Sequence, residues 1–274
     1  HGWNLREGIK YIRNMTDKPI GFNALIEKGS KRYMDRMSKW IDIALEEGIR
    51  FFVTSLGKPD WVCKRVHEAD GFVYHDVTTR LWAQKGQDNG VDGLICVNNR
   101  AGGHLGDYSM ENMYNDIADL GLPMICAGGI GSEVELKKAI NLGYQGVQMG
   151  TRFIATNECN TSEDYKAAII QASEEDIVMT KKMTGVPISV IKSKYYKEDN
   201  PWFIQKLLQG RFKHTTRMLL NLNSFIRLKY LSKGKFKNKD KKKQYYSAGK
   251  SVDTVKNIQS ATDIMRTLGA SLTN

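Results

Sequence analysis

The chain has 274 residues and a mass of 31.1 kDa, enough for one large domain or two small ones. Charged residues make up 26% of it, and no run approaches the roughly 20 apolar residues that a bilayer crossing needs, which argues against a membrane-spanning helix. The net charge of +11 is uneven, because residues 1–180 carry −5 and residues 181–274 carry +16. The basic residues are densest over residues 211–243, a stretch that contains 12 of them and a single acidic residue, Asp240.

A lysine-rich run of this kind is typical of a solvated surface segment, and it would attract an acidic partner or another polyanion. Specific nucleic-acid binding is not expected, because the aromatic residues between the lysines are too sparse to form a base-stacking platform. The leucine-rich stretch just before the lysine run, within residues 201–231, predicts one or two amphipathic helices. These helices could pack on the main domain or lie on a membrane surface, and the first alternative is favoured.

The cysteines are Cys63, Cys96, Cys126 and Cys159, and none of them forms the close pair that a zinc or thioredoxin-like site uses. We expect reduced, buried thiols. With no charged-then-apolar leader at the start of the sequence, this favours a reducing, cytoplasmic location.

Six short β-branched and apolar runs recur along the chain, and each is followed by a helical pattern. The predicted strands cover residues 20–26, 51–56, 72–77, 93–98, 123–127 and 146–150. Their starts are 21 to 31 residues apart, the length of one βα unit, and their apolar character favours parallel strands covered on both faces. The sequence therefore predicts an α/β fold.

Helices are predicted over residues 33–48, 109–120, 132–142, 162–173 and 259–268. Ser109 is the expected cap of the second of these helices, and Ser132 with Glu135 forms a capping box at the third. The pattern becomes irregular through residues 184–187. The expected organisation is a barrel over residues 1–180, an irregular and basic helical insert over residues 181–244, and a last segment, residues 245–274, that returns to the barrel.

Residues 98–106, which we call the histidine loop, follow the fourth predicted strand and read Asn-Asn-Arg-Ala-Gly-Gly-His-Leu-Gly. Paired glycines permit a positive φ and let the backbone approach a ligand closely. In α/β folds the carboxyl ends of strands carry the ligands, so His104 is expected at the mouth of a site. A tight turn with a solvent-exposed histidine remains the alternative.

Two further glycine turns follow the next two strands. They read Gly-Gly-Ile-Gly at residues 128–131 and Gly-Thr-Arg-Phe at residues 150–153. Backbone N–H groups in such turns, with small hydroxyl side chains nearby, suit a dianionic phosphate. Each turn could also serve only to reverse the chain, but two adjacent turns of this kind favour phosphate binding.

Three motifs together resemble the nitronate monooxygenase family: Ala-Gly-Gly-His-Leu-Gly at residues 101–106, Ala-Gly-Gly-Ile-Gly at residues 127–131, and the glycine-rich run over residues 143–153. The resemblance implies a TIM (β/α)₈-type barrel, of which about six strands are visible here, with a helical C-terminal extension. It also implies bound FMN and the oxidation of alkyl nitronates or nitroalkanes by molecular oxygen. The family's first two βα units have no counterpart in this sequence.

The resemblance implies that His104 is the active-site base toward the substrate's α-carbon. The implied FMN contacts are Asn23, Ala101, Gly102, Gly103, Ala127, Gly128, Gly129, Met149, Gly150 and Thr151. No metal site is expected. The chain departs from the family at His75-Asp76, where many members have lysine, and at Lys250, where glutamine is frequent. His75 is a second strand-end histidine, either a site member or a satisfied rim residue.

Two other functions stay open. The flavin-dependent enoyl-acyl-carrier-protein reductases share the barrel and a similar histidine motif, and the basic tail could attract an acidic carrier protein. A polyanion-binding module that uses the lysine-rich segment is a lower alternative, because the remainder of the chain is acidic.

Overall fold

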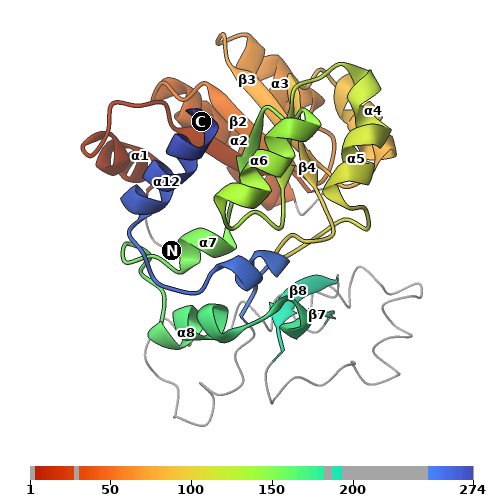
Figure 1. Ribbon diagram of the computed structural model, residues 1–274. Helices are drawn as coiled ribbons and strands as arrows, with labels where there is room; N and C mark the ends of the chain where they lie inside the picture. The colour runs from red at the N-terminus through yellow and green to blue at the C-terminus, as the bar shows by residue number, and fades with distance from the viewer. Residues whose placement is uncertain (1–3, 28–30, 182–186, 193–245, 274) are drawn as a thin grey trace, which may run out of the picture. The chain divides into compact units, whose positions relative to one another are not determined.

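The structure is a computed structural model, and it describes residues 4–27, 31–181, 187–192 and 246–273 (Figure 1). The chain forms two compact units. The first unit comprises His1–Val97, Tyr108–Cys126 and Leu142–Gly146, and the second comprises Asn98–Asp107, Ala127–Asn141 and Val147–Asn274. Three of the breaks between the units fall at or close to the carboxyl ends of the fourth, fifth and sixth strands. The loops after these strands therefore belong to the second unit.

A six-stranded sheet has its strands in chain order, β1-β2-β3-β4-β5-β6. The strands are β1 (Gly21–Leu25), β2 (Phe51–Ser55), β3 (Phe72–Val77), β4 (Gly93–Val97), β5 (Met124–Ala127) and β6 (Gly146–Gln148). The first four pair in parallel, with Asn23 opposite Val53 and Val53 opposite Tyr74. All six predicted strands are confirmed, and the α/β prediction with them.

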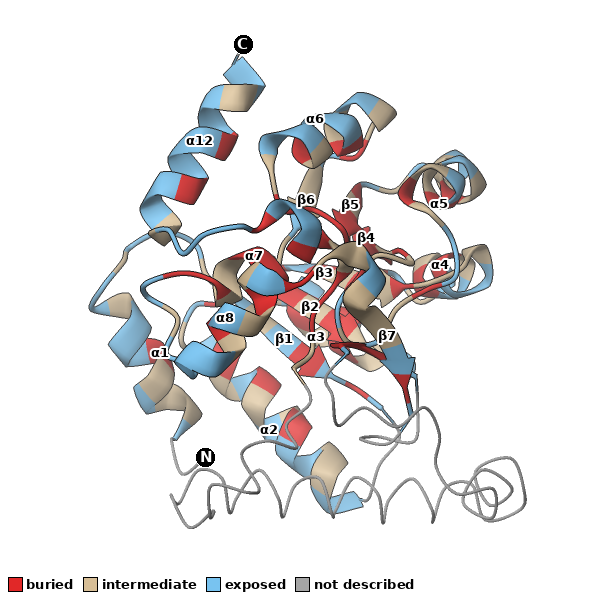
Figure 2. Cartoon of the chain, turned by 60° about the horizontal axis from the view of Figure 1, so that its bottom comes forward, coloured by how far each residue is buried: buried red, intermediate tan, exposed pale blue. Residues whose placement is uncertain are grey.

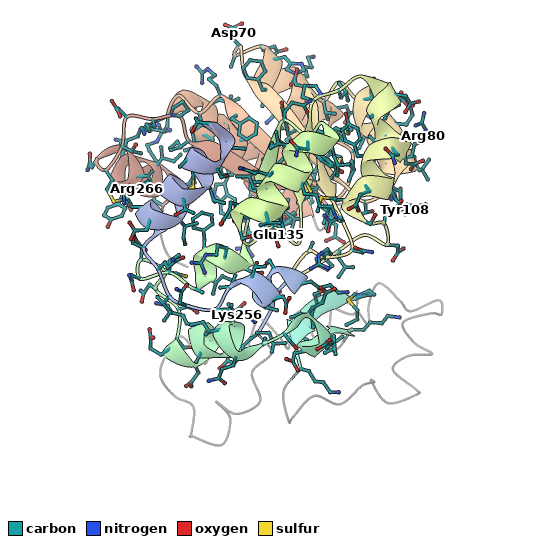
Figure 3. All side chains as sticks on the ribbon, in the orientation of Figure 1. Asp70, Arg80, Tyr108, Glu135, Lys256 and Arg266 are labelled. Atoms are coloured by element: carbon teal, nitrogen blue, oxygen red, sulfur yellow. The ribbon has the colours of Figure 1, made fainter. Side chains whose placement is uncertain are left out.

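In the first unit one helix precedes these strands and the others connect them (Figure 1). They are α1 (Leu5–Arg13), α2 (Lys31–Glu46), α3 (Asp60–His67), α4 (Arg80–Asp88) and α5 (Met110–Ile117), which continues into the 3₁₀ turn η1 (Ala118–Leu120). α5 begins where predicted, because Ser109 Oγ accepts the Asn112 N–H at 3.2 Å. The ion pair between Arg80 and Asp119, whose arginine Figure 3 labels, joins the start of α4 to η1.

The strands of the first unit alternate between two faces. One face carries the buried side chains of Phe52, Thr54 and Val73, and buried residues are red in Figure 2. Because residues two apart share a face, Asn23 and Asp76 lie on the opposite one. The face that carries Phe52, Thr54 and Val73 therefore differs in chemical character from the face that carries Asn23 and Asp76.

His75 belongs to the helix-covered face. Its ring is buried, its Nδ1 lies 2.8 Å from Thr54 Oγ1, and Gly86 of α4 packs beside it. Burial lowers the pKa of His75 to about 4, so the imidazole is neutral at pH 7. His75 is thus a satisfied buried residue and not a member of a strand-end site.

Asp76 lies on the other face with an unsatisfied oxygen. Asp76 Oδ1 is buried and has no hydrogen-bond partner in the part of the chain that the structure describes. Burial raises the pKa of Asp76 from 3.8 to about 6. At neutral pH the folded protein therefore holds a carboxylate that its surroundings disfavour.

We expect Asp76→Asn to stabilise the protein at neutral pH. Below pH 3.8 the carboxyl is protonated in folded and unfolded chains alike, whereas above pH 6 only the folded chain bears the cost of the buried charge. The stabilisation should be on the order of 2 kcal/mol at pH 7 and shrink as the pH falls through 6 toward 4. Urea unfolding of both proteins at pH 7 and pH 5 measures this difference.

The matched control is Asp70→Asn, which removes an exposed carboxylate of the same unit (Figure 3). Its effect on the free energy of unfolding should not change between the two pH values. A stability difference for Asp76→Asn that is equally independent of pH would contradict the raised pKa.

The second unit contains the later elements of the chain. α6 (Glu133–Leu142) starts in this unit, followed by α7 (Thr151–Ile154), α8 (Glu163–Gln171), η2 (Glu174–Asp176), β7 (Ile177–Thr180), β8 (Ile188–Ile191), η3 (Lys250–Thr254) and α12 (Ala261–Thr273). The predicted cap of α6 is confirmed, because Glu135 Oε2 accepts the Ser132 N–H at 2.8 Å. β7 and β8 pair antiparallel, a pairing that the sequence analysis did not predict.

A small apolar core holds this unit together. It consists of Ala155, Ile169, Ala172, Ile191, Ala248, Val252 and Val255. Tyr165 and Tyr246 stack beside it with ring centroids 4.7 Å apart. The last segment therefore packs with residues far earlier in the sequence.

The predicted boundaries at residues 181 and 245 stay predictions, because most of the basic insert, including residues 201–231 and the lysine run, lies outside the described residues.

The cysteines are free thiols, and Cys63, Cys96 and Cys126 are buried as predicted, whereas Cys159 is half-buried. Burial raises the pKa of both Cys63 and Cys96 to about 12, so these two thiols are protonated and unreactive at neutral pH.

Within the described ranges, none of the helices has the length and apolar character that crossing a membrane requires.

Candidate functional site

Asn98 anchors the histidine loop to the turn that follows β5. Its backbone N–H donates to Ala127 O at 2.9 Å, and its side-chain Nδ2 donates to Gly128 O at 2.9 Å. Asn98 Oδ1 accepts the Arg100 N–H at 2.8 Å. The residue is fully buried, so one side-chain amide satisfies the backbone of two loops at once.

Gly128 and Gly129 permit this close approach. Their φ angles are +114° and +77°, a region that other residues rarely adopt. A Cβ on Gly128 would lie 2.4 Å from Asn98 Oδ1, and one on Gly129 would lie 2.7 Å from Arg100 Nε. Both glycines are therefore required by packing against the histidine loop, whatever ligand the turn binds.

The late segment Ser247–Lys250 joins the same group of loops. Lys250 N donates to Arg100 O at 2.9 Å, and Gly249 N donates to Thr151 Oγ1 at 3.0 Å. A Cβ on Gly102 would lie 2.8 Å from Gly249 N, so these two backbones touch. The histidine loop, the turns after β5 and β6, and the late segment thus form one packed cluster, which we call the glycine cluster.

Open space in the glycine cluster lies at two other glycines. Apart from its chain neighbours, no heavy atom of the described residues lies within 4 Å of the place where a Cβ on Gly150 would stand, and the nearest such atom at Gly103 is Ser247 Oγ at 3.9 Å. Gly103 O accepts the Ser189 N–H of β8 at 2.8 Å, which fixes the backbone just before His104. The His104 side chain is exposed. Among the described residues, these two positions leave room for a Cβ, unlike Gly128 and Gly129.

An ion-pair network braces the glycine cluster. Glu174 binds Arg100 at 2.7 Å and Lys250 at 3.1 Å, so one carboxylate serves the histidine loop and the late segment. Burial alone raises the pKa of Glu174, but hydrogen bonds from Lys250 and Arg100 outweigh it and hold the pKa below its usual value. Glu174 is therefore ionised at neutral pH.

Most of the predicted site residues come together in the glycine cluster. These are Ala101, Gly102, Gly103, His104, Ala127, Gly128, Gly129, Met149, Gly150 and Thr151, all in the second unit. Asn23 lies on β1 in the first unit, with its side chain exposed. No group of metal-binding side chains occurs among the residues that the structure describes.

Sequence reasoning missed Glu174 as part of this cluster. Asn98 was singled out as the first residue of the histidine loop, but its hydrogen bond to the turn after β5 was not predicted. Glu174 carried no signal, since its ion pairs join segments far apart in the chain.

Mutually packed glycine turns at the carboxyl ends of strands, with an exposed histidine among them, define an α/β ligand-binding protein of the barrel class. The chain matches the family model described as nitronate monooxygenase over residues 2–270. It therefore belongs to the nitronate monooxygenase family, as the motifs predicted.

Two curated relatives illustrate the similarity. The "(3aS,4S,5R,7aS)-5-hydroxy-7a-methyl-1-oxo-octahydro-1H-indene-4-carboxyl-CoA dehydrogenase" of Mycobacterium tuberculosis is 27% identical over 233 residues, covering 83% of this chain and 62% of the relative. A "probable nitronate monooxygenase" of Staphylococcus saprophyticus is 26% identical over 241 residues, covering 72% of this chain and 68% of the relative. The chain thus spans about two thirds of the length of these relatives.

Solved structures confirm the barrel fold. FabK from Thermotoga maritima matches with a TM-score of 0.77 at 24% identity, over 98% of this chain and 80% of FabK. Nitroalkane oxidase from Streptomyces ansochromogenes matches with a TM-score of 0.76 at 17% identity, over 98% of this chain and 84% of the oxidase. At such identities the similarity concerns the fold.

Proposed function

We propose that this protein is an FMN-dependent oxidoreductase that oxidises alkyl nitronates or nitroalkanes with molecular oxygen, and that His104 is its base. The supporting observation is the glycine cluster, in which an exposed histidine shares one packed group of loops with the open backbone at Gly103 and Gly150. Membership of the nitronate monooxygenase family supports the same reaction class.

The glycine cluster suits the phosphate of FMN. The backbone N–H groups of the turns at Gly128–Gly129 and Gly150–Thr151 would hold the phosphate oxygens. Thr151 Oγ1 accepts the Gly249 N–H, so its own hydrogen stays available to donate to a phosphate oxygen. The remaining predicted contacts, Asn23 and Met149 among them, stay predictions.

His104 is the residue to which we assign the proton transfer. When bound, FMN supplies the electron acceptance and the oxygen reactivity that amino-acid side chains lack. The chain contributes an imidazole, which takes a proton from the α-carbon of a neutral nitroalkane, since histidine exchanges protons near neutral pH. The hydrogen bond from Ser189 N to Gly103 O limits backbone movement beside this imidazole.

The decisive experiment separates this reaction from enoyl reduction. The purified full chain is incubated with FMN, and flavin absorbance after gel filtration reports binding. We expect oxygen consumption and nitrite release with a nitronate, and slow anaerobic reduction of the bound flavin by NADH or NADPH. Fast reduction by a nicotinamide, without oxidation of the nitronate, would instead support the enoyl-acyl-carrier-protein reductase.

The proposed partners are a small nitronate or nitroalkane and oxygen. An acidic partner for the basic segment stays a prediction, because the lysine-rich run lies outside the described ranges. A cytoplasmic location also stays a prediction.

A further inference from the structure

Cys96 of β4 and Cys126 of β5 are thiols on neighbouring strands of the first unit. Both residues are fully buried. The proposed function uses neither of them, so their position calls for a separate account.

Backbone hydrogen bonds on either side set these two cysteines directly opposite each other. Leu94 N donates to Pro123 O, and Asn98 N donates to Ala127 O, each at 2.9 Å. The offset between donor and acceptor is the same in both bonds, so the register is constant between them. In a parallel ladder an N–H reaches the carbonyl of the residue before its partner, which makes the two cysteines partners. The strand spacing of about 4.8 Å lies within the Cα separation of about 4.4–6.8 Å over which two cysteines can be joined.

The pair lies on the helix-covered face of the sheet. Cys96 is opposite Val77 of β3, which shares that face with His75. α5 packs against β4, and its Met113 is fully buried. Burial is the main cause of the raised pKa of Cys96, and the thiol of Cys126 is the second cause, as expected of close neighbours.

This apolar setting limits what the two thiols can bind. Structural zinc takes about four ligands, and no group of three or more metal-binding side chains occurs among the residues that the structure describes. A disulfide would need an oxidant and a Cβ separation of about 3.8 Å, which is shorter than the strand spacing. A ligand atom that bonds both sulfur atoms and leaves no net charge meets these limits, because a charge is costly to bury.

We propose that Cys96 and Cys126 form a binding site for trivalent arsenic. Arsenite, As(OH)₃, condenses with two thiols: two S–H bonds and two As–O bonds break, and two As–S bonds form. The thiol protons leave with the two hydroxyl groups as two water molecules. Arsenic keeps its oxidation state, so the step needs no oxidant or reductant. The product, (RS)₂As–OH, is neutral and therefore suits the buried position.

The test measures arsenic bound to the purified full chain. The chain is incubated with arsenite for several hours, because buried thiols are reached only when the core opens locally. Gel filtration removes free arsenite, and elemental mass spectrometry counts the bound arsenic. We expect one arsenic atom per chain in the wild type. Cys96→Ser and Cys126→Ser should each bind arsenite about 10²-fold more weakly, because a single thiol cannot chelate it.

Two matched variants test the assignment to this pair. Cys63→Ser removes another buried thiol of the first unit, and Cys159→Ser removes the half-buried thiol of the second unit. Each of these variants should still bind one arsenic atom per chain with the affinity of the wild type.

A wild-type chain that retains no arsenic overturns the proposal, and so does a Cys96 or Cys126 variant that binds as tightly as the wild type. Circular dichroism identifies a variant that does not fold. X-ray absorption by arsenic bound to the wild type then decides. Two sulfur neighbours per arsenic, with binding kept in Cys63→Ser and Cys159→Ser, support the pair. Any other number of sulfur neighbours, or loss of binding in either of these variants, contradicts it.

Discussion

His104→Ala should abolish most turnover of neutral nitroalkanes while the protein keeps its bound flavin. The expected loss in kcat/KM is about 10²- to 10⁴-fold, the usual contribution of a positioned general base. The fold should be unaffected, since the side chain is exposed. Oxygen consumption with nitroethane, measured on variant and wild type at equal flavin content, tests the expectation.

The substrate itself provides the control. A nitronate has already lost the α-proton, so His104→Ala should slow its oxidation far less than that of the neutral nitroalkane. His67→Ala, which removes an exposed histidine bonded to Asp92 in the first unit, should change neither rate. Equal losses on nitronate and nitroalkane would show that His104 does not act as the base.

Gly128→Ala should destabilise the protein strongly even without a ligand. The new Cβ would stand 2.4 Å from Asn98 Oδ1 and 2.7 Å from Ala101 N, and φ at this position is +114°. Relief of the clash requires Asn98 to give up its buried hydrogen bonds to Gly128 O and Arg100 N. We expect a loss of about 3 kcal/mol in the free energy of unfolding, measured with urea on the apoprotein.

Gly150→Ala is the matched substitution in the neighbouring turn. Its φ is −118°, and in the part of the chain that the structure describes no atom beyond its chain neighbours stands within 4 Å of the new methyl group, so the apoprotein should keep its stability. The methyl group fills the space that the proposed phosphate would use, so the affinity for FMN should fall. Unchanged FMN affinity in Gly150→Ala, or unchanged stability in Gly128→Ala, would contradict the division of roles between the two turns.

Much of the fold could be predicted from the sequence because its signals are local. Parallel strands buried on both faces read as apolar runs, and capped helices such as the one that begins after Ser109 carry their own start signals. The pairing of β7 with β8 was missed for the opposite reason. Each strand has four residues, and a Gly-Val-Pro sequence intervenes, which reads as irregular chain.

The site was predictable in residue type but not in contacts. Glycine turns after strands marked Gly102, Gly128 and Gly150, yet only the structure separates glycines that serve packing from those that leave open space. Strand-end position left two roles open for His75, and alternation along β3 turns this residue toward the helices, where its hydrogen bond to Thr54 satisfies it.

The hydrogen bond from Lys250 N to Arg100 O constrains how the protein is made in the cell. The ribosome synthesises Arg100 first and reaches Lys250 about 150 residues later, a delay of roughly 8–30 s at about 5–20 residues per second. Until then Gly102 lacks the backbone against which it packs. The nascent chain must therefore carry the histidine loop without these contacts during that interval, in which chaperones can act.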